Sequence, residues 1–457
     1  MKEKPEGSLA KMGMELGRSG KREEQGQGHE QRVDPRLYLA VDNCFASKRW
    51  TRPSEWMSLL QSMGVHYVEA SADNEIDPLY MGEAYMKRWA EEVREESGKT
   101  GVRVANLYSG HGTYATLGLA HPDESVRDRI QQSWVEPMAE LAAELGAGLG
   151  FYCYAFSEAV LQNPEAYRTA ENDLYRRLAE IAESCKRLGV LTPGVEQMYT
   201  PHQIPWTIQG AKRLLGEVSR RSDAPFYLTL DTGHQSGQRK FLQPDEETIE
   251  AWAEDCRLKG DSIDSSARLP ERGARSHVDA QTSSLWLGPQ SANTLFAELV
   301  QAEGIERTAI MEQIKLEMNR YPYLFAQRSD GDTYRWLAEL GCFSPILHLQ
   351  QTNGRSSSHR PFTEAYNHEG IIFGEPVLRA LEKAYLSPAE KGMPPKCEAI
   401  YFTLEIFSAT SDTSAAILHN IQQSVEYWRQ FIPEDGIKLS EALSRLNKEQ
   451  SNVCTDS

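Results

Sequence analysis

The sequence predicts an α/β protein, a single (β/α)₈ barrel with a long insertion between its sixth and seventh strands. The first observation behind this prediction is a series of eight strand-length segments rich in β-branched or aromatic residues. These segments are mostly apolar throughout rather than alternating, which is typical of parallel strands buried on both faces. They lie at 37–42, 66–73, 102–110, 148–156, 192–199, 225–234, 345–352 and 399–407.

The second observation is the helical periodicity of the segments between these strands. Apolar residues from Leu174 to Leu188 recur three or four positions apart and stop before Gly189, a residue type that commonly ends helices. Similar apolar stripes cover 56–63 after the first strand and 417–428 after the last. Eight alternations of strand and helix favour a closed barrel over an open doubly wound sheet.

The predicted barrel spans residues 34–434, between a disordered N-terminal tail (1–33) and a C-terminal tail (435–457). The connection between strands six and seven, at about 235–344, is far longer than the ~25 to 40 residues that a barrel crossover needs. Within it, the segment 259–288 is rich in Ser, Arg and Gly and is typical of an exposed loop. The insertion leaves the C-terminal end of a strand, so it would either lie over the active face or be a surface elaboration without a role.

The composition argues against several classes of protein. The formal net charge of −17 disfavours a nucleic-acid partner, because phosphate binding normally requires a basic surface. The seven cysteines form no CxxC pair, which disfavours a disulfide framework or a zinc–thiolate site and fits a reducing, cytoplasmic location. The N-terminus has no signal-peptide pattern, and no apolar run reaches the ~18 residues that a membrane span needs. Whether the chain forms a homo-oligomer is left open.

Ionisable residues stand at the C-terminal ends of the predicted strands, where barrel enzymes carry their catalytic groups. Four of them interrupt the consecutive apolar strands five to eight: Glu196, Asp231, His348 and Glu405. An ionisable side chain buried in a strand is costly unless it is paired or bound to a metal. Three carboxylates and one imidazole would suit Mn²⁺, Mg²⁺ or Co²⁺, and Zn²⁺ less readily. For any one of the four, a satisfied charge at the barrel rim is the alternative interpretation.

The first three strands carry further ionisable residues near their ends. Asp42, Glu69, Asp73 and His111 occupy these positions. Glu69 and Asp73 could contact substrate hydroxyls or support metal ligands, and we assign them no role from the sequence.

The segments around the four strand-end residues resemble the xylose-isomerase-like barrel superfamily. The similar segments are GVEQMYTP, LDTGHQSG, HLQQTNG and TLEIF. This resemblance covers roughly residues 37–432 and implies that the four residues bind one metal ion while His234 contacts substrate oxygens. In some members the metal-binding histidine is the second of an HxH pair, and that position is Gln350 here.

A narrower resemblance suggests the reaction. The segments LAVDNCFASKRWTRPSEWM, VEASADNEIDPLYMG and HLQQTNGRSSSHRPFT are similar to the tetrulose-phosphate racemases and epimerases of erythritol catabolism. The implied activity is metal-dependent epimerisation or isomerisation of a small ketose phosphate through a cis-enediolate. Epimerisation needs an acid/base group on each face of the substrate. Glu196 and Glu405 are the candidates for these groups, and Asp231 and His348 would only bind the metal.

Two basic clusters could bind the phosphate of such a substrate. Lys48 and Arg49 follow the first strand, and Arg355, His359 and Arg360 follow the seventh. Arginine can bind a phosphate group through two parallel hydrogen bonds. The alternative for each of these residues is a solvated loop charge.

Two other functions stay open at this point. An endonuclease IV-like phosphodiesterase would use the same barrel, but it needs additional histidines from strands two and three and a basic groove. Strand two offers Glu69 and Asp73 instead, and the net charge is −17. A non-catalytic sugar-binding barrel would be expected to have lost one of the four ligands, and all four are present.

Overall fold

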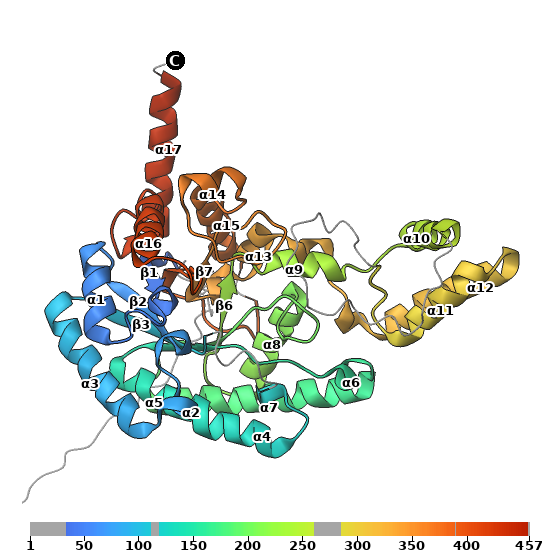
Figure 1. Ribbon diagram of the computed structural model, residues 1–457, viewed down its shortest axis with the longest axis horizontal. Coiled ribbons are helices and arrows are strands. Elements are labelled where there is room, and N and C mark those ends of the chain that lie inside the picture. The colour runs from blue at the N-terminus through green and yellow to red at the C-terminus, as the bar shows by residue number, and fades with distance from the viewer. Residues whose placement is uncertain (1–32, 111–117, 260–284, 389, 456–457) are drawn as a thin grey trace, which may run out of the picture. The chain divides into compact units, whose positions relative to one another are not determined.

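The eight predicted strands form the wall of one closed barrel (Figure 1). The computed structural model describes residues 33–110, 118–259, 285–388 and 390–455. The expected N-terminal tail up to residue 32, His111 and most of the expected 259–288 loop lie outside these ranges. The barrel strands are β1 (Arg36–Asp42), β2 (Tyr67–Ser71), β3 (Arg103–Tyr108), β4 (Gly148–Phe151), β5 (Pro193–Glu196), β6 (Tyr227–Asp231), β7 (Ile346–Leu349) and β8 (Ala399–Leu404).

Each barrel strand pairs in parallel with its neighbour, and β1 pairs with both β8 and β2, which closes the barrel. The predicted (β/α)₈ fold is therefore confirmed. The register places Asp231 of β6 beside His348 of β7. Because all eight strands run in the same direction, their C-terminal ends meet at one mouth of the barrel.

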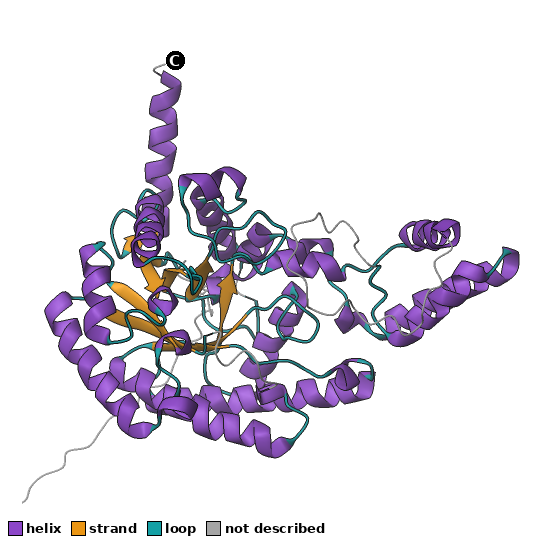
Figure 2. Ribbon diagram, viewed as in Figure 1, coloured by secondary structure: helices purple, strands orange, loops and turns teal. Residues whose placement is uncertain are grey.

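Helices cover the outer face of the strands (Figure 2). Those before β6 are α1 (Pro53–Ser62), α2 (Pro78–Met81), α3 (Glu83–Thr100), α4 (Glu124–Ile130), α5 (Glu136–Leu145), α6 (Glu158–Leu161), α7 (Pro164–Leu188) and α8 (Ile208–Arg221). The predicted stripe from Leu174 to Leu188 lies on α7, and Gly189 ends this helix in the left-handed conformation. Glycine carries no Cβ, so it adopts this conformation without strain.

The connection from β6 to β7 contains further helices. They are α9 (Gln235–Gln238), α10 (Glu246–Lys259), α11 (Gln290–Gln301), α12 (Gly304–Arg320) and α13 (Thr333–Leu340). Helix α11 packs against both α10 and α12, and in Figure 1 these three lie to one side of the barrel. The connection is therefore largely helical where it is described.

The chain after β7 completes the helical wall. It forms α14 (Glu364–Glu369), α15 (Gly374–Leu386) and, after β8, α16 (Ser414–Arg429). The segment 435–457, which the sequence analysis treats as a tail, contains the short strand β9 (Ile437–Lys438) and helix α17 (Leu439–Thr455). Strand β9 pairs antiparallel with the start of β1.

Apolar side chains fill the layer between strands and helices. Trp428 of α16 is fully buried and packs against Phe402 of β8 and against Phe362. Burying rings of this size is a large favourable contribution to folding. The described helices include none that is both long and apolar enough to cross a membrane.

The close pairing of β5 with β6 leads to a prediction. A Cβ added to Gly194 would lie 2.7 Å from the backbone oxygen of Tyr227, closer than real Cβ contacts allow. Gly194→Ala should therefore lower the free energy of unfolding by about 1–3 kcal/mol in urea denaturation, because overpacking strains the backbone. The control is Gly216→Ala in α8, where a Cβ meets nothing within 4 Å. That change should stabilise the helix by up to about 1 kcal/mol. Equal effects of the two substitutions would contradict the packing argument.

Candidate metal centre

Four ionisable side chains from consecutive strands meet at the C-terminal mouth of the barrel. Glu196 ends β5, Asp231 ends β6, His348 lies in β7 and Glu405 directly follows β8. All four are buried, and they offer ligand atoms that all lie within 4.8 Å of one another. The structure thus brings together the four residues predicted from the sequence to bind one metal ion.

His348 is held by carboxylates on both edges of its ring. Its Nδ1 lies 2.9 Å from Glu196 Oε1 and 3.3 Å from Glu405 Oε2, while its Nε2 lies 2.6 Å from Glu69 Oε1. The ring also meets the ring of Tyr108 at a right angle, with centroids 4.9 Å apart. Burial acts to lower the pKa of His348, but Glu405 and Glu69 outweigh it and hold the pKa well above its ordinary value.

The Glu405 carboxylate indicates that a cation fits this cluster. Its Oε2 is buried without a hydrogen bond among the described residues, although Nδ1 of His348 and Nδ1 of His359 each lie 3.3 Å away. Burial acts to raise the pKa of Glu405, but the two histidines bring it well below its usual value. Such a buried charge is costly unless it is compensated. A divalent ion could bind this oxygen together with ligand atoms of the other three residues. Because three of the four ligands are carboxylates, the set fits Mn²⁺, Mg²⁺ or Co²⁺.

Gln350, the alternative position for a metal-binding histidine, also lies in the site. Its Nε2 donates hydrogen bonds to both carboxylate oxygens of Asp231, at 3.0 and 2.9 Å. Its Oε1 accepts the backbone N–H groups of Ser358 and His359. The carboxamide therefore orients Asp231 and holds the loop after β7, and His348 is the one of the two whose nitrogen lies among the other ligand atoms.

His234 lies beside the same carboxylate. Its Nδ1 is 2.7 Å from the backbone oxygen of Gln197, and its Nε2 is 3.9 Å from Asp231 Oδ2. A carbonyl oxygen can only accept a hydrogen bond, so Nδ1 carries the proton. The Nε2 edge of His234 is therefore the one directed toward the cluster, where a substrate oxygen could be bound.

Two of the five predicted phosphate-binding residues are engaged elsewhere. Arg49 donates hydrogen bonds to backbone carbonyls of the loop 409–412, so it joins the loops after β1 and β8. Arg360 lies over the ring of Tyr366 and 3.8 Å from a carboxylate oxygen of Glu369. Both guanidinium groups have partners within the chain.

The other three differ in their surroundings. Lys48 and Arg355 are exposed, and the described part of the chain offers neither an ion-pair partner. His359 instead faces Glu405 and stacks on the ring of Phe407, with centroids 4.1 Å apart. Its backbone has a φ of 45°, a conformation that non-glycine residues adopt rarely and that a rigid loop must hold in place. Of the three, His359 is the residue that reaches the cluster.

Two supporting residues on β3, Tyr108 and Asn106, are not among those predicted from the sequence. The Tyr108 hydroxyl donates a hydrogen bond to Glu196 Oε2, and Asn106 Nδ2 donates one to Glu69 Oε2 at 2.5 Å. Residues two apart on a strand point to the same face, so both side chains enter the barrel interior. A polar or hydroxyl-bearing residue at every second position of an otherwise apolar strand is the signal that could have identified them.

Asp42, at the end of β1, adds another buried carboxyl group to this mouth. Its Oδ1 accepts hydrogen bonds from the backbone of Cys44 and the hydroxyl of Ser71. Burial raises the pKa of Asp42 well above its ordinary value, and the neighbouring carboxylates of Glu69 and Glu405 raise it further. The mouth therefore concentrates carboxylates whose mutual repulsion a bound cation would relieve.

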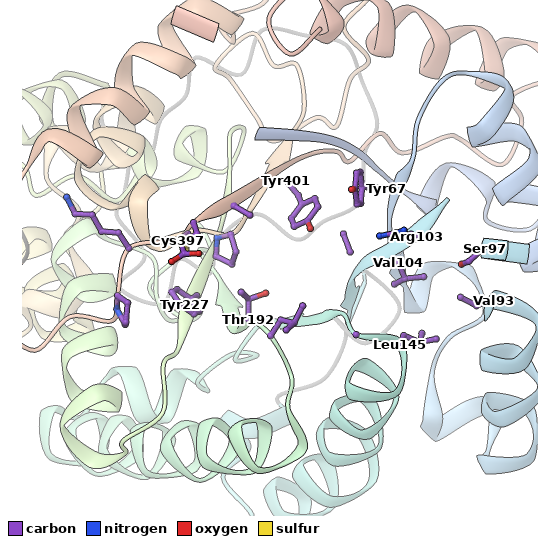
Figure 3. Close-up of a pocket in the computed structure, with 18 of the residues that line it drawn as sticks. Tyr67, Val93, Ser97, Arg103, Val104, Leu145, Thr192, Tyr227, Cys397 and Tyr401 are labelled. Carbon is purple, nitrogen blue, oxygen red and sulfur yellow. The ribbon is translucent and has the colours of Figure 1, made fainter. Parts of the chain in front are cut away.

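A cavity of about 730 Å³ opens at the opposite end of the barrel (Figure 3). Its lining includes Tyr67, Arg103 and Tyr227, the first residues of β2, β3 and β6. In barrels of this kind the chemistry takes place where the strands end, not where they begin. We therefore assign the candidate site to the carboxylate cluster, whose ligand chemistry this cavity lacks.

The comparisons with known proteins support the same fold. The model of the xylose isomerase-like TIM barrel family matches residues 57–264. A candidate xylose isomerase from Rhodospirillum rubrum superposes with a TM-score of 0.58 at 17% identity, covering 86% of this chain and 98% of that one. An L-ribulose 3-epimerase gives a TM-score of 0.48 at 14% identity, covering 91% and 98%. The family model confirms the resemblance to the xylose-isomerase-like barrels, and the Rhodospirillum structure confirms the fold.

One curated relative matches a smaller part of the sequence. D-erythrulose 1-phosphate 3-epimerase of Brucella abortus (strain 2308) is 30% identical over 104 residues. These residues make up 22% of this chain and 30% of that protein. The chain thus matches less than a third of the length of this relative.

The His359–Glu405 pair predicts how stability depends on pH in protein freed of metal with EDTA. Burial acts to lower the pKa of His359, but Glu405 raises it to about 9. The folded state then holds this proton more tightly than the unfolded chain. The contribution of the His359–Glu405 pair to the free energy of unfolding is therefore fully present below about pH 6.5. It is lost as the pH rises through 9.

The measurement is the free energy of unfolding of wild type and of His359→Gln by urea denaturation between pH 6 and 9.5. The difference between the two proteins should shrink as the pH rises. His368→Gln, at an exposed position on α14, serves as the control. If the free energy of unfolding depends on pH in the same way in all three proteins, the His359–Glu405 pair does not contribute to stability as predicted.

Proposed function

We propose that this chain is a divalent-metal-dependent isomerase that epimerises a small ketose phosphate, with a tetrulose phosphate as the favoured substrate. The observation that carries the proposal is the buried set of Glu196, Asp231, His348 and Glu405 at the C-terminal mouth of the barrel. The local similarity to D-erythrulose 1-phosphate 3-epimerase supports this substrate class. Mn²⁺, Mg²⁺ or Co²⁺ is the proposed cofactor, because oxygen ligands predominate.

The proposed reaction moves a proton between the two faces of one carbon. A bound divalent cation would polarise the substrate carbonyl and so acidify the neighbouring C–H bond. One glutamate, Glu196 or Glu405, takes this proton, and the electrons of the C–H bond pass into a cis-enediolate. The other, as a carboxylic acid, returns a proton to the opposite face. The two residues come from β5 and β8, separated by two strands in the barrel wall, so they approach the centre from different sides.

Neighbouring residues support these roles. Tyr108 donates a hydrogen bond to Glu196, and His359 lies beside Glu405, so each glutamate has a partner that holds its carboxyl group in place. We assign His234 to a substrate oxygen because its Nε2 edge faces the cluster. For the substrate phosphate we favour Lys48 and Arg355, whose charges are not paired within the described residues.

Proton exchange in D₂O tests the proposed function directly. The protein with Mn²⁺ is incubated with tetrulose and pentulose phosphates and with the corresponding free sugars, and deuterium incorporation is followed by NMR. Epimerisation and aldose–ketose isomerisation both use an enediolate. The carbon that acquires deuterium distinguishes the two reactions. If none of these ketoses exchanges a proton, the proposal is wrong. Cleavage of abasic DNA under the same conditions would instead favour the endonuclease interpretation.

The two-base mechanism predicts different effects for the metal ligands. Glu196→Gln and Glu405→Gln should each lower the rate of net epimerisation by about 10²–10⁴-fold, because a carboxamide cannot exchange a proton. One of these variants should still exchange the substrate proton with solvent from its remaining face. Asp231→Asn should lose activity mainly through metal affinity and recover part of it in excess Mn²⁺. Normal turnover by both glutamine variants in saturating Mn²⁺ would rule the mechanism out.

The proposed phosphate contact gives a separate prediction. Arg355→Ala should raise KM for the phosphorylated ketose about 10-fold or more, since an ion-paired hydrogen bond to phosphate contributes roughly 1.5–3 kcal/mol. The KM for the free sugar should change little. Arg379→Ala, on the outer helix α15, is the control. If the two substrates respond equally to Arg355→Ala, this arginine does not bind the phosphate.

A further inference from the structure

We infer that Glu69 is the residue that positions His348 for metal binding, through a hydrogen bond from the outer edge of the imidazole. The inference rests on the proposed metal site and assigns a role to a residue that the sequence alone left without one. Glu69 is fully buried on β2, and its Oε1 lies 2.6 Å from His348 Nε2. It therefore contacts the ring on the edge that faces away from Glu196 and Glu405.

The geometry separates this role from that of a fifth ligand. Both oxygens of Glu69 are already used, since Oε1 contacts His348 and Oε2 accepts a hydrogen bond from Asn106 Nδ2 at 2.5 Å. The other ring nitrogen, Nδ1, lies 2.9 Å from Glu196 Oε1. The imidazole thus stands between Glu69 and the remaining carboxylates, with Nδ1 on the side where the ligand atoms converge.

A carboxylate at this position selects the tautomer of the ring. An ionised carboxylate can only accept a hydrogen bond, so the contact with Glu69 requires a proton on His348 Nε2. Nδ1, 2.9 Å from Glu196 Oε1, is the nitrogen that faces the cluster. A bound metal ion would take the place of a proton on Nδ1, and the neutral imidazole would offer it the Nδ1 lone pair. Carboxylates that support a metal-binding histidine in this way typically raise metal affinity by 10–100-fold.

The surrounding residues hold this arrangement in place. Asn106 and Glu69 are register partners on the adjacent strands β3 and β2. Tyr108, two residues further along β3, packs its ring against the His348 ring at a right angle. The barrel wall therefore restricts both the carboxylate and the rotation of the imidazole, which is what a positioning contact requires.

The test is a calorimetric titration of the metal-free protein with Mn²⁺. Glu69→Ala should weaken Mn²⁺ binding by about 10–100-fold. Glu69→Gln should retain most of the affinity, because its carbonyl oxygen can still accept from Nε2. Its amide could then donate to Asn106 Oδ1, which has no hydrogen bond in the described structure. Glu83→Gln, an exposed carboxylate at the start of α3, should bind Mn²⁺ like wild type.

A second measurement reads the tautomer itself. Nitrogen-15 shifts of His348 in the Zn²⁺-loaded protein should show a protonated Nε2 and a metal-bound Nδ1. Metal bound at Nε2, or wild-type Mn²⁺ affinity in a folded Glu69→Ala variant, overturns the inference and leaves the proposed reaction standing. Should Glu69→Ala fail to fold, the nitrogen shifts of wild type and Glu69→Gln decide the question.

The inference and the proposed function fail separately. Wild-type protein that binds Mn²⁺ in a Glu69-dependent way but exchanges no ketose proton would overturn the proposed function only. Protein that binds no divalent ion would overturn both.

Discussion

The concentration of buried negative charge at one mouth of the barrel is the constraint on which the rest of the site depends. An isolated carboxylate inside a protein is unfavourable by several kcal/mol, and several carboxylates in contact repel one another as well. His348 contacts three of them, Glu69, Glu196 and Glu405, through its two ring nitrogens. Even so, a buried oxygen of Glu405 has no hydrogen bond in the described structure. A divalent cation, as we propose, would compensate such an arrangement.

The barrel can hold these buried carboxylates close together because its strands are rigid, are shielded from water and all end at the same mouth. Parallel strands bring side chains from distant parts of the sequence to one end, while the apolar layer outside them excludes water. Strands β5 to β8 provide the four candidate ligands, and β2 and β3 provide the residues that support them. The four candidate ligands thus come from one half of the barrel wall, and Glu69, Asn106 and Tyr108 come from the other half.

The loop after β7 connects this site to its surroundings. Gln350 binds Asp231 with its amide and holds the backbone of Ser358 and His359 with its oxygen. His359 then returns to the cluster and contacts Glu405. A single carboxamide thus links the end of β6, the loop after β7 and, through that loop, the end of β8.

The sequence alone determined the barrel and four residues of its candidate site, for two physical reasons. Strands buried on both faces must be apolar throughout, so eight such segments are visible without a structure, and Glu196, Asp231, His348 and Glu405 stand out as costly exceptions within them. Only the tertiary structure decided which neighbours compensate these four. Glu69 is separated from His348 by 279 positions and Tyr108 from Glu196 by 88, and no periodic pattern relates residues so far apart. Likewise, the chemistry of arginine suggested that Arg49 could bind phosphate, but the fold directs its guanidinium to backbone carbonyls of the loop after β8. The local sequence shows whether a side chain belongs to a buried strand. The closure of the barrel decides which side chains of other strands it contacts.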